Sequence, residues 1–362
     1  MGIADHLYGV ILAGGIGTRF WPKSREDKPK QYLAMISDET LIQNTVARLL
    51  GLVPSDRLFI VSTRAQEHLL KEQLPHLHAD HFIFEPMGRN TAPAIGLAAV
   101  HLRRLDPDAV MLAAPADHLI QRTELFYHAV RAALRVIEKE PSATVTFGIP
   151  PTYPATGYGY IEAGRKLDEP SVFQAASFRE KPDAETAQQF LQSGTFYWNS
   201  GIFLWRVDRL MQLIEKWMPE LYEGLQQIDN SIDEGCFDEV CAAVYQRLAG
   251  RSIDYGVMEK ADCIYMVKGE FLWNDLGSWE EVYRLSPKDD SLNAVFGKPL
   301  LKDVRNSYID VQSRTVSIIG VEDLIVIEQA DALLICGMRH SQEVRWVTNE
   351  LHQLKNRNSL KE

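Results

Sequence analysis

Short apolar runs alternate with amphipathic segments along the first third of the chain. The runs end at polar or glycine-rich positions, which is typical of buried parallel strands. The predicted strands are residues 8–13, 58–61, 82–84 and 110–114. The amphipathic segments have helical spacing, and the predicted helices are residues 39–50, 66–74 and 91–104. This alternation predicts an α/β fold with a doubly wound, mostly parallel sheet, whose ligands gather beyond the carboxyl ends of the strands.

The pattern changes after about residue 289, where few helical segments interrupt short β-rich runs. Before that point, the later predicted helices are residues 208–225 and 238–248. After it, the β-rich runs are residues 315–319, 324–328 and 332–336, followed by a closing helix over 342–354. We therefore expect a large α/β domain over residues 1–288 and a small β-helix-like domain over residues 289–362. The small domain would serve in packing or in dimer contact, which leaves a homodimer open.

The first predicted strand leads into Gly14, Gly15 and Gly17, and a basic tract follows these glycines. Glycine allows positive φ and lets backbone N–H groups approach an anion without interference from a Cβ atom. The cations of the tract are Arg19, Lys23, Arg25, Lys28 and Lys30. Cations gathered on a glycine-rich loop indicate a polyphosphate ligand. The alternative is a glycine-rich turn followed by solvated charges.

Two well-known phosphate loops do not match this segment. A dinucleotide-binding loop needs a third glycine where this chain has Thr18-Arg19-Phe20, and an acidic residue at the end of the second strand. That strand instead ends in Ser62-Thr63. A Walker loop needs Gly-Lys-Ser/Thr at the start of a helix, and the sequence lacks this tripeptide. The loop is therefore a phosphate loop of a third kind.

Composition narrows the class of protein. The chain has 362 residues, of which 46% are hydrophobic and 24% charged, as in ordinary globular proteins. Its net charge of −11 argues against a nucleic-acid-binding surface, so the basic tract is a local feature. The cysteines show no metal-type pairing and indicate reduced thiols; they are Cys236, Cys241, Cys263 and Cys336. With neither a signal-peptide pattern nor an apolar run approaching 18 residues, we expect a cytoplasmic protein without a nucleic-acid or membrane partner.

Polar residues follow two of the later predicted strands. Residues 85–93 open a helix, and their polar side chains and free N–H groups could read the edge of a base; alternatively, Asn90 is only a helix cap. Asp117 follows a fully apolar strand, which is a common position for a Mg²⁺ ligand. A second carboxylate, Asp275, lies far downstream, and either aspartate could instead cap a helix. His118 has no clustered His or Cys partner, so we interpret it as structural or as supporting Asp117.

The middle of the chain has the composition of a sugar pocket. A Gly/Tyr-rich loop over residues 156–162 is followed by 178–182 and by an aromatic segment over 196–203. Sugar pockets need directional donors and acceptors between apolar walls, and Glu162, Asn199 and the tyrosines supply them. The alternative is a polar face on β-strands.

Residues 14–19, followed by Trp21-Pro22 and Lys28-Pro29-Lys30-Gln31, resemble the signature loop of the sugar-nucleotidyltransferases. Within them, the chain looks most like the mannose-1-phosphate guanylyltransferases, which make GDP-mannose from GTP and mannose 1-phosphate. Asn90-Thr91-Ala92 matches the guanylyltransferase form, and residues 252–260 resemble a motif typical of the mannose enzymes. The departures from the family pattern are Ile16, Lys23 and Gly256, where the family commonly has Ser, Leu and Ala.

The resemblance implies a Rossmann-like nucleotidyltransferase fold, with the catalytic domain over residues 1–288, and transfer of GMP from GTP with Mg²⁺ or another divalent cation. The implied catalytic residues are Arg19, Lys30, Asp117 and Asp275, of which Asp117 and Asp275 hold the metal. The implied nucleotide-binding residues are Leu12, Ala13, Gly14, Gly15, Gly17, Thr18, Glu85, Asn90, Thr91 and Pro115. The implied sugar-phosphate-binding residues are Gly159, Glu162, Lys181 and Asn199, with Lys181 on the phosphate.

Three related expectations accompany this reading. Longer family members carry a phosphomannose isomerase domain with a metal-binding cupin sequence, which this sequence lacks, so we expect no isomerase activity. The nearer alternative is a related nucleotidyltransferase that uses another base or sugar phosphate. The more distant alternative is a non-catalytic, sugar-nucleotide-binding regulatory subunit. Such a subunit should lack the loop lysine or a metal carboxylate, and this chain has both.

Overall fold

The computed structural model describes residues 2–15 and 17–359, without the side chains of residues 355–359. Contacts divide the chain into two compact units. The first unit comprises Met1–Gly14, Thr45–Ala116 and Ile120–Trp273, and the second comprises Gly15–Asn44, Asp117–Leu119 and Asn274–Glu362. Within the described ranges, no helix is long and apolar enough to cross a membrane.

The first unit is built on a nine-stranded sheet with the order β3-β2-β1-β4-β9-β6-β10-β8-β7. Its strands are β1 (Leu7–Leu12), β2 (Leu58–Thr63), β3 (Phe82–Glu85), β4 (Val110–Pro115), β6 (Thr144–Ile149), β7 (Tyr160–Lys166), β8 (Val172–Arg179), β9 (Phe196–Arg206) and β10 (Ile264–Lys268). Strands β3, β2, β1 and β4 are parallel to one another, and β9 lies antiparallel between β4 and β6. The predicted α/β fold is confirmed, but the prediction of a mostly parallel sheet is wrong, because β9, β7 and β8 pair antiparallel with their neighbours. The short β7–β8 connection explains one antiparallel pair, because a parallel connection needs a dozen or more residues.

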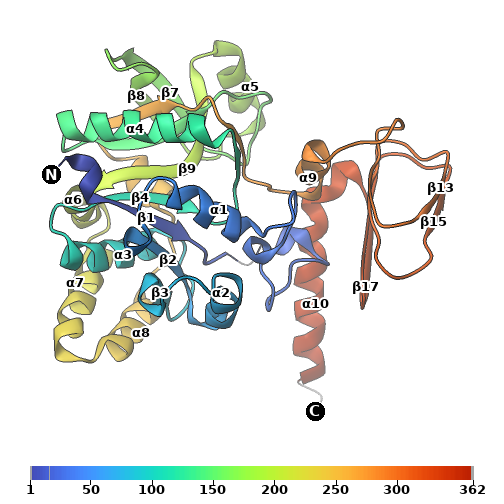
Figure 1. Ribbon diagram of the computed structural model, residues 1–362, viewed down its shortest axis with the longest axis horizontal. Coiled ribbons are helices and arrows are strands. Elements are labelled where there is room, and N and C mark those ends of the chain that lie inside the picture. Colours follow the sequence, from blue (N-terminus) through green and yellow to red (C-terminus); the bar gives the residue numbers. More distant parts are fainter. Residues whose placement is uncertain (1, 16, 360–362) are drawn as a thin grey trace. The chain divides into compact units, whose positions relative to one another are not determined.

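Helices cover both faces of this sheet (Figure 1). On one face lie α3 (Thr91–Leu105), α6 (Val207–Trp217), α7 (Pro219–Glu234) and α8 (Phe237–Arg247), and on the other lies α4 (Thr123–Lys139). The remaining helices before residue 200 are α1 (Leu41–Leu50), α2 (Glu67–Gln73) and α5 (Ala184–Ser193). The single helix predicted over 208–225 is wrong. Pro219 ends α6 and begins α7, because proline clashes with a preceding helical turn but suits a first turn.

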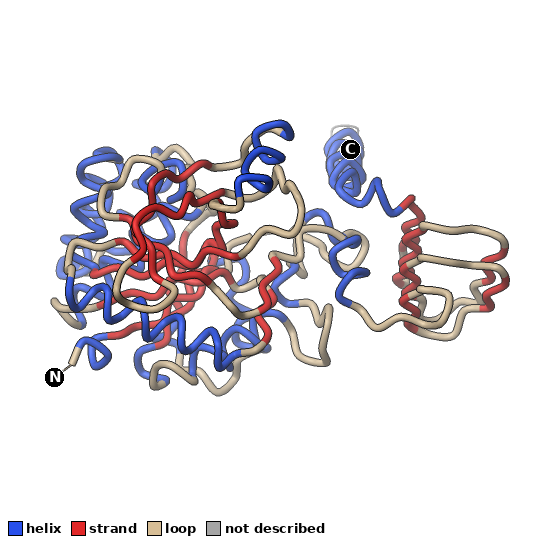
Figure 2. Tube along the Cα trace, turned by 90° about the horizontal axis from the view of Figure 1, so that it is seen from above, coloured by secondary structure: helices blue, strands red, loops and turns tan. Residues whose placement is uncertain are grey.

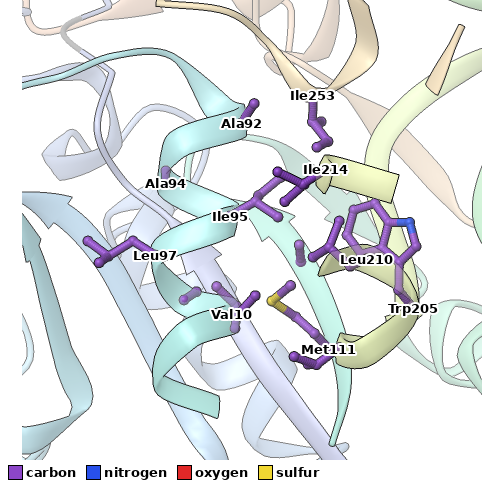
Figure 3. Close-up of a cluster of buried hydrophobic side chains, with 14 of the residues drawn as sticks. Val10, Ala92, Ala94, Ile95, Leu97, Met111, Trp205, Leu210, Ile214 and Ile253 are labelled. Atoms are coloured by element: carbon purple, nitrogen blue, oxygen red, sulfur yellow. The ribbon is translucent and has the colours of Figure 1, made fainter. Parts of the chain in front are cut away.

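The main core of the first unit lies between the sheet and α3 and α6 (Figure 3). Val10 of β1 and Met111 of β4 point toward Ile95 of α3, and Leu210 of α6 and Trp205 of β9 fill the space beside it. Small residues such as Ala92 and Ala98 are fully buried along α3. The packing fixes the ends of β1, β3 and β4, which lead into the predicted nucleotide-binding segments.

The second unit contains a short β-helix-like coil (Figure 2). Its larger sheet consists of β12 (Ala294–Phe296), β14 (Tyr308–Asp310), β16 (Leu324–Gln329) and β17 (Ala332–Gly337). The smaller sheet pairs β13 (Leu300–Lys302) with β15 (Ser317–Ile319), and Figure 2 shows the strands stacked as successive rungs. All pairings in the coil are parallel except that of β16 with β17. The predicted β-rich C-terminal coil is therefore confirmed.

The coil shares its core with residues from the N-terminal part of the chain. Phe20 lies in one buried cluster with Trp279 and Tyr308, and its ring meets that of Trp279 edge-on at 5.1 Å. Trp279 begins α9 (Trp279–Leu285), and Val344 of the last helix, α10 (Val344–Ser359), belongs to the same cluster. The short strands β5 (Leu119–Gln121) and β11 (Leu272–Asn274) pair with each other. The domain division between residues 288 and 289 stays a prediction.

Candidate functional site

The glycine loop packs directly on Lys30. Gly17 has a φ of +68°, and a Cβ atom there would overlap the Lys30 side chain, so both backbone conformation and space require glycine. The buried Gln31 donates a hydrogen bond from Nε2 to the carbonyl of Gly15 at 2.9 Å. The loop is thus held against the segment that carries Lys30. Ile16, where the family commonly has Ser, lies outside the described residues.

Lys30 is a buried cation of the second unit. Its side chain is only 6% exposed, and its ammonium donates to Asp117 Oδ2 at 2.9 Å and to the main-chain carbonyl of Asp275 at 2.6 Å. A buried ammonium is costly unless it is paired and hydrogen-bonded, and these contacts provide both. Lys30 therefore joins three segments that are far apart in the sequence.

Asp117 is held in its ionised form. Burial raises the pKa of its carboxyl, but the charges of Lys30 and His118 and the hydrogen bond from Lys30 outweigh this effect and lower the pKa overall. His118 Nε2 lies 3.9 Å from Asp117 Oδ1, which fits the predicted supporting role. Asp117 does not cap a helix, because the strand β5 follows it.

Asp275 is placed by a tight turn before α9. Asn274 accepts a hydrogen bond from the N–H of Leu276 at 2.7 Å and donates one to Glu281 at 2.7 Å. Leu276 has a φ of +47°, and the N-cap of α9 is Ser278, whose hydroxyl accepts from the N–H of Glu281. Asp275 is therefore not the cap of this helix.

A pocket of about 210 Å³ brings these residues together within the second unit. The predicted residues that line it are Gly17, Thr18, Arg19, Lys30, Asp117 and Asp275. The other lining residues are Phe20, His118, Leu276, Gly277 and Arg345. The four predicted catalytic residues thus share one pocket, although Asp275 is separated from the glycine loop by most of the chain.

The basic tract is not a single anion-binding surface. Arg19 donates to the carbonyl of Gly277 at 3.4 Å and lines the pocket. Lys23 instead forms an ion pair with Asp310, and Arg25 forms a two-point ion pair with Asp331 at 2.6 and 2.9 Å. Lys23 and Arg25 therefore do not line the pocket that Arg19 and Lys30 line. Their charges are taken by aspartates of the C-terminal coil, which the sequence pattern did not place nearby.

The pocket offers the donor set that Mg²⁺ prefers. Asp117 and Asp275 each carry a carboxylate, which is a hard oxygen donor, and both line the same pocket. Mg²⁺ is commonly held by one or two carboxylates together with substrate phosphates. In the described part of the chain, no group of three or more His, Cys, Asp or Glu residues is arranged to hold a metal by itself. The donor set therefore fits a cation that is bound jointly with a phosphorylated substrate.

The first unit contains the predicted base-binding segment. Leu12 pairs with Pro115 across β1 and β4, and Ala13 donates from its N–H to the carbonyl of Val61 at 2.8 Å. Glu85 ends β3 and is 2% exposed, and its Oε2 lies 3.4 Å from the position that a Cβ atom on Gly14 would occupy. The Glu85 carboxylate therefore lies next to Gly14 at the end of β1.

The Glu85 carboxyl is buried beside an aromatic hydroxyl. Burial raises its pKa to about 7, and Glu85 in turn contributes to the raised pKa of Tyr245. The interaction of the Tyr245 hydroxyl with the Glu85 carboxyl offsets only part of the effect of burial on the Glu85 pKa. Glu85 is therefore largely protonated at slightly acidic pH.

Thr91 connects the predicted base-binding segment, residues 85–93, with residues 252–260. Asn90 has a φ of +71° and caps α3, with its side-chain oxygen accepting from the N–H of Thr91 at 2.8 Å. The Thr91 hydroxyl accepts from the N–H of Ile253 at 2.9 Å. Asn90 is thus a helix cap, as in the alternative interpretation. Its side chain is exposed, and its predicted contact with the nucleotide stays a prediction.

Three of the four predicted sugar-phosphate residues lie together in the first unit. The Gly159 carbonyl accepts from the N–H of Asn199 at 2.8 Å, and the Lys181 N–H donates to the neighbouring Tyr158 carbonyl at 3.2 Å. The Glu180 carboxylate lies against Gly159, so that a Cβ atom on Gly159 would require the Glu180 side chain to move. Lys181 Nζ is 3.2 Å from Glu180 Oε1.

Glu162 is placed differently. It accepts a hydrogen bond from Ser177 at 2.8 Å, and among the described residues no hydrogen bond or ion pair links it to the other three. Sequence reasoning missed two carboxylates beside Asn199 and Lys181. Asp254 accepts from Asn199 Nδ2 at 2.9 Å, and burial raises its pKa. Burial and the Asp254 charge raise the pKa of Glu180 to about 7.

Comparison with known proteins identifies the family of the chain. A sequence model described as nucleotidyl transferase matches residues 8–291, and one described as a MannoseP isomerase/GMP-like beta-helix domain matches residues 300–351. The chain belongs to the nucleotidyl transferase family. The expected enzyme class and fold are thereby confirmed for a member of this family.

Named relatives cover nearly the whole chain. Mannose-1-phosphate guanylyltransferases of Klebsiella pneumoniae and Escherichia coli are each 38% identical over 354 residues, which is 96% of this chain and 74% of the relative. A crystal structure of a protein named mannose-1-phosphate geranyltransferase, from Thermus thermophilus, has a TM-score of 0.85 and 31% identity. It covers 96% of this chain and 99% of that one.

Replacing Glu85 with glutamine should change the pH dependence of stability of this nucleotidyltransferase. The folded-state pKa is about 7 against an ordinary value of 4.5, so between these pH values the folded state keeps a proton that the unfolded state loses. The free energy of unfolding of the wild type should therefore fall from pH 4.5 to 7, by up to about 3 kcal/mol from this group. The Glu85→Gln variant should lack this component in urea denaturation.

The exposed Glu72 on α2 provides the matched control. The Glu72→Gln variant should retain the pH dependence of the wild type. Equal pH dependence in Glu85→Gln and wild type would contradict a protonated, buried Glu85.

Proposed function

We propose that this chain transfers GMP from GTP to α-D-mannose 1-phosphate, forming GDP-mannose and pyrophosphate. The observation that carries the proposal is the pocket in which Arg19 and Lys30 lie with the carboxylates of Asp117 and Asp275. The names of the relatives support the choice of GTP and mannose 1-phosphate. A non-catalytic binding subunit is disfavoured because all four residues are present in one pocket.

The reaction needs charge compensation more than proton transfer. A phosphate monoester is largely dianionic at pH 7, because its second pKa is about 6, so the sugar phosphate needs no general base. One of its oxygens forms a bond to the α-phosphorus of GTP in line with the leaving group. The bond from that phosphorus to the oxygen bridging to the β-phosphate breaks, and its electron pair leaves with pyrophosphate. The main obstacle is repulsion between two anions.

The residues of the second unit would offset this repulsion. Arg19 and Lys30 would contact the triphosphate, and the N–H groups of the glycine loop would add oriented dipoles. When bound, Mg²⁺ would neutralise charge on the α-phosphate and on the departing pyrophosphate; Asp117 and Asp275 would hold it. The contacts of Lys30 keep Asp117 ionised and in place for this role. Another divalent cation with oxygen preference would suit the same ligands.

The predicted residues of the first unit would bind the nucleoside, the base and the sugar phosphate. Leu12, Ala13, Gly14 and Pro115 would position the nucleoside, and Asn90 and Thr91 would contact the base. For the sugar, the cluster of Asn199, Asp254 and Glu180 offers hydrogen-bond donors and acceptors for hydroxyl groups. The Lys181 ammonium would bind the phosphate of mannose 1-phosphate. A cytoplasmic location and a homodimer stay predictions.

A substrate panel tests the proposed reaction. The purified protein should release pyrophosphate fastest with GTP and mannose 1-phosphate, and a chelator should abolish the release. ATP, UTP and dTTP, each paired with mannose 1-phosphate and then with glucose 1-phosphate, serve as comparisons. Faster release with another pair would overturn the assigned base or sugar. No release with any pair, from folded protein, would favour the binding subunit.

Loss of the Lys30 charge should lower the rate strongly. The Lys30→Met variant should lose on the order of 10²-fold in kcat, by analogy with removal of one stabilising donor. Lys28→Met is the matched control, because Lys28 is exposed on the same tract and its side chain does not line the pocket. Equal rates for the two variants, measured as pyrophosphate release, would contradict the role of Lys30.

Lys181 should affect the sugar phosphate alone. The Lys181→Gln variant should raise the KM for mannose 1-phosphate about tenfold, as expected for loss of one charge-assisted hydrogen bond, and leave the KM for GTP nearly unchanged. Lys166→Gln, which removes an exposed charge from β7, provides the control. A rise in the KM for GTP alone would place Lys181 in the nucleotide site instead.

A further inference from the structure

The last helix of the chain contributes a cation to the pocket of the second unit. Arg345 is the second residue of α10 and lines the same pocket as Arg19, Lys30 and Asp117. The residue before it, Val344, is 2% exposed and lies in one hydrophobic cluster with Phe20 and Leu276. Phe20 and Leu276 also line the pocket. The start of α10 is therefore fixed against the wall of the pocket.

The charge of Arg345 is not used by the protein itself. Its side chain is exposed, and within the described ranges its guanidinium makes no hydrogen bond or ion pair. The neighbouring cations differ: Lys30 is paired with Asp117, and Lys23 is paired with Asp310. A cation without a protein partner, held at a pocket by a buried neighbour, is available to an anionic ligand.

The chemistry of the side chain indicates which anion it would bind. A guanidinium presents several N–H donors in a fixed plane that matches phosphate oxygens, often with two hydrogen bonds. Most of the negative charge of a nucleoside triphosphate lies on its β- and γ-phosphates. An exposed guanidinium that lines the same pocket as Lys30 would therefore be drawn to this part of the substrate.

We propose that Arg345 binds the β- and γ-phosphates of the nucleoside triphosphate, so that α10 completes the substrate site. This inference rests on the proposed function, because it requires a polyphosphate in the pocket. It gives the C-terminal helix a role in substrate binding beyond packing. It also fits the position of the start of α10, which packs against the segment of Phe20 that follows the glycine loop.

Nucleotide binding to the full chain tests this role directly. GTP and GMP would be titrated calorimetrically with Mg²⁺ and without mannose 1-phosphate, so that no turnover occurs. Arg345→Ala should weaken GTP binding about 10- to 100-fold, as expected for charge-assisted hydrogen bonds. GMP binding should change less than about twofold, because GMP lacks the β- and γ-phosphates. Arg345→Lys, which keeps the charge but loses the planar fork, should bind GTP with intermediate affinity.

The control variant is Arg339→Ala. Arg339 is exposed, lies shortly before α10 in the same unit and does not line the pocket, so the variant should bind GTP like the wild type. Unchanged GTP binding by Arg345→Ala, equal weakening of GTP and GMP, or the same loss in Arg339→Ala would each overturn the proposal. A wild type that binds GTP but releases no pyrophosphate would refute only the transfer reaction. A wild type that binds neither nucleotide would refute both proposals.

Discussion

The site of the second unit depends on one buried charge. Lys30 reaches the carboxylate of Asp117 and the carbonyl of Asp275, and the glycine loop can lie against it only because Gly17 lacks a side chain. A buried ammonium without these partners would be strongly destabilising. The contacts that satisfy Lys30 therefore also determine where both candidate metal ligands lie. The same contacts that stabilise the buried Lys30 charge therefore also assemble the pocket.

Much of the architecture could be predicted from the sequence, because the periods of the apolar residues match the elements. Strands β1, β2 and β4 and helix α3 lie close to their predicted positions, and the short β-rich runs form the C-terminal coil. The antiparallel insertion of β9 between β4 and β6 was not predictable, since strand order depends on long-range pairing. Pro219 by itself indicated a helix break, but the helical spacing of the apolar residues continues across it and led to the prediction of a single helix.

The residues of the candidate site that follow predicted strands could be predicted from the sequence. Those that come from distant parts of the chain could be predicted less well. The loop residues and Asp117 follow recognisable strands, whereas Asp275 came only through the family resemblance. Nothing in the sequence pattern indicated that Asp310 and Asp331 would neutralise Lys23 and Arg25, or that Arg345 would line the pocket. These pairings depend on how the C-terminal coil packs around Phe20 and Trp279. Whether a charged residue of the tract is available to a ligand therefore depends on ion pairs that the sequence alone does not show.

The most direct test of the central claim is to follow the oxygen atoms of the phosphate through the reaction. Mannose 1-phosphate labelled with ¹⁸O on its non-bridging phosphate oxygens would be incubated with GTP, Mg²⁺ and the protein, and the products examined by ³¹P NMR. The account predicts GDP-mannose with label in the oxygen between its two phosphorus atoms, and unlabelled pyrophosphate. Label in the released pyrophosphate, or no nucleotide sugar at all, would contradict attack by the sugar phosphate on the α-phosphorus of GTP.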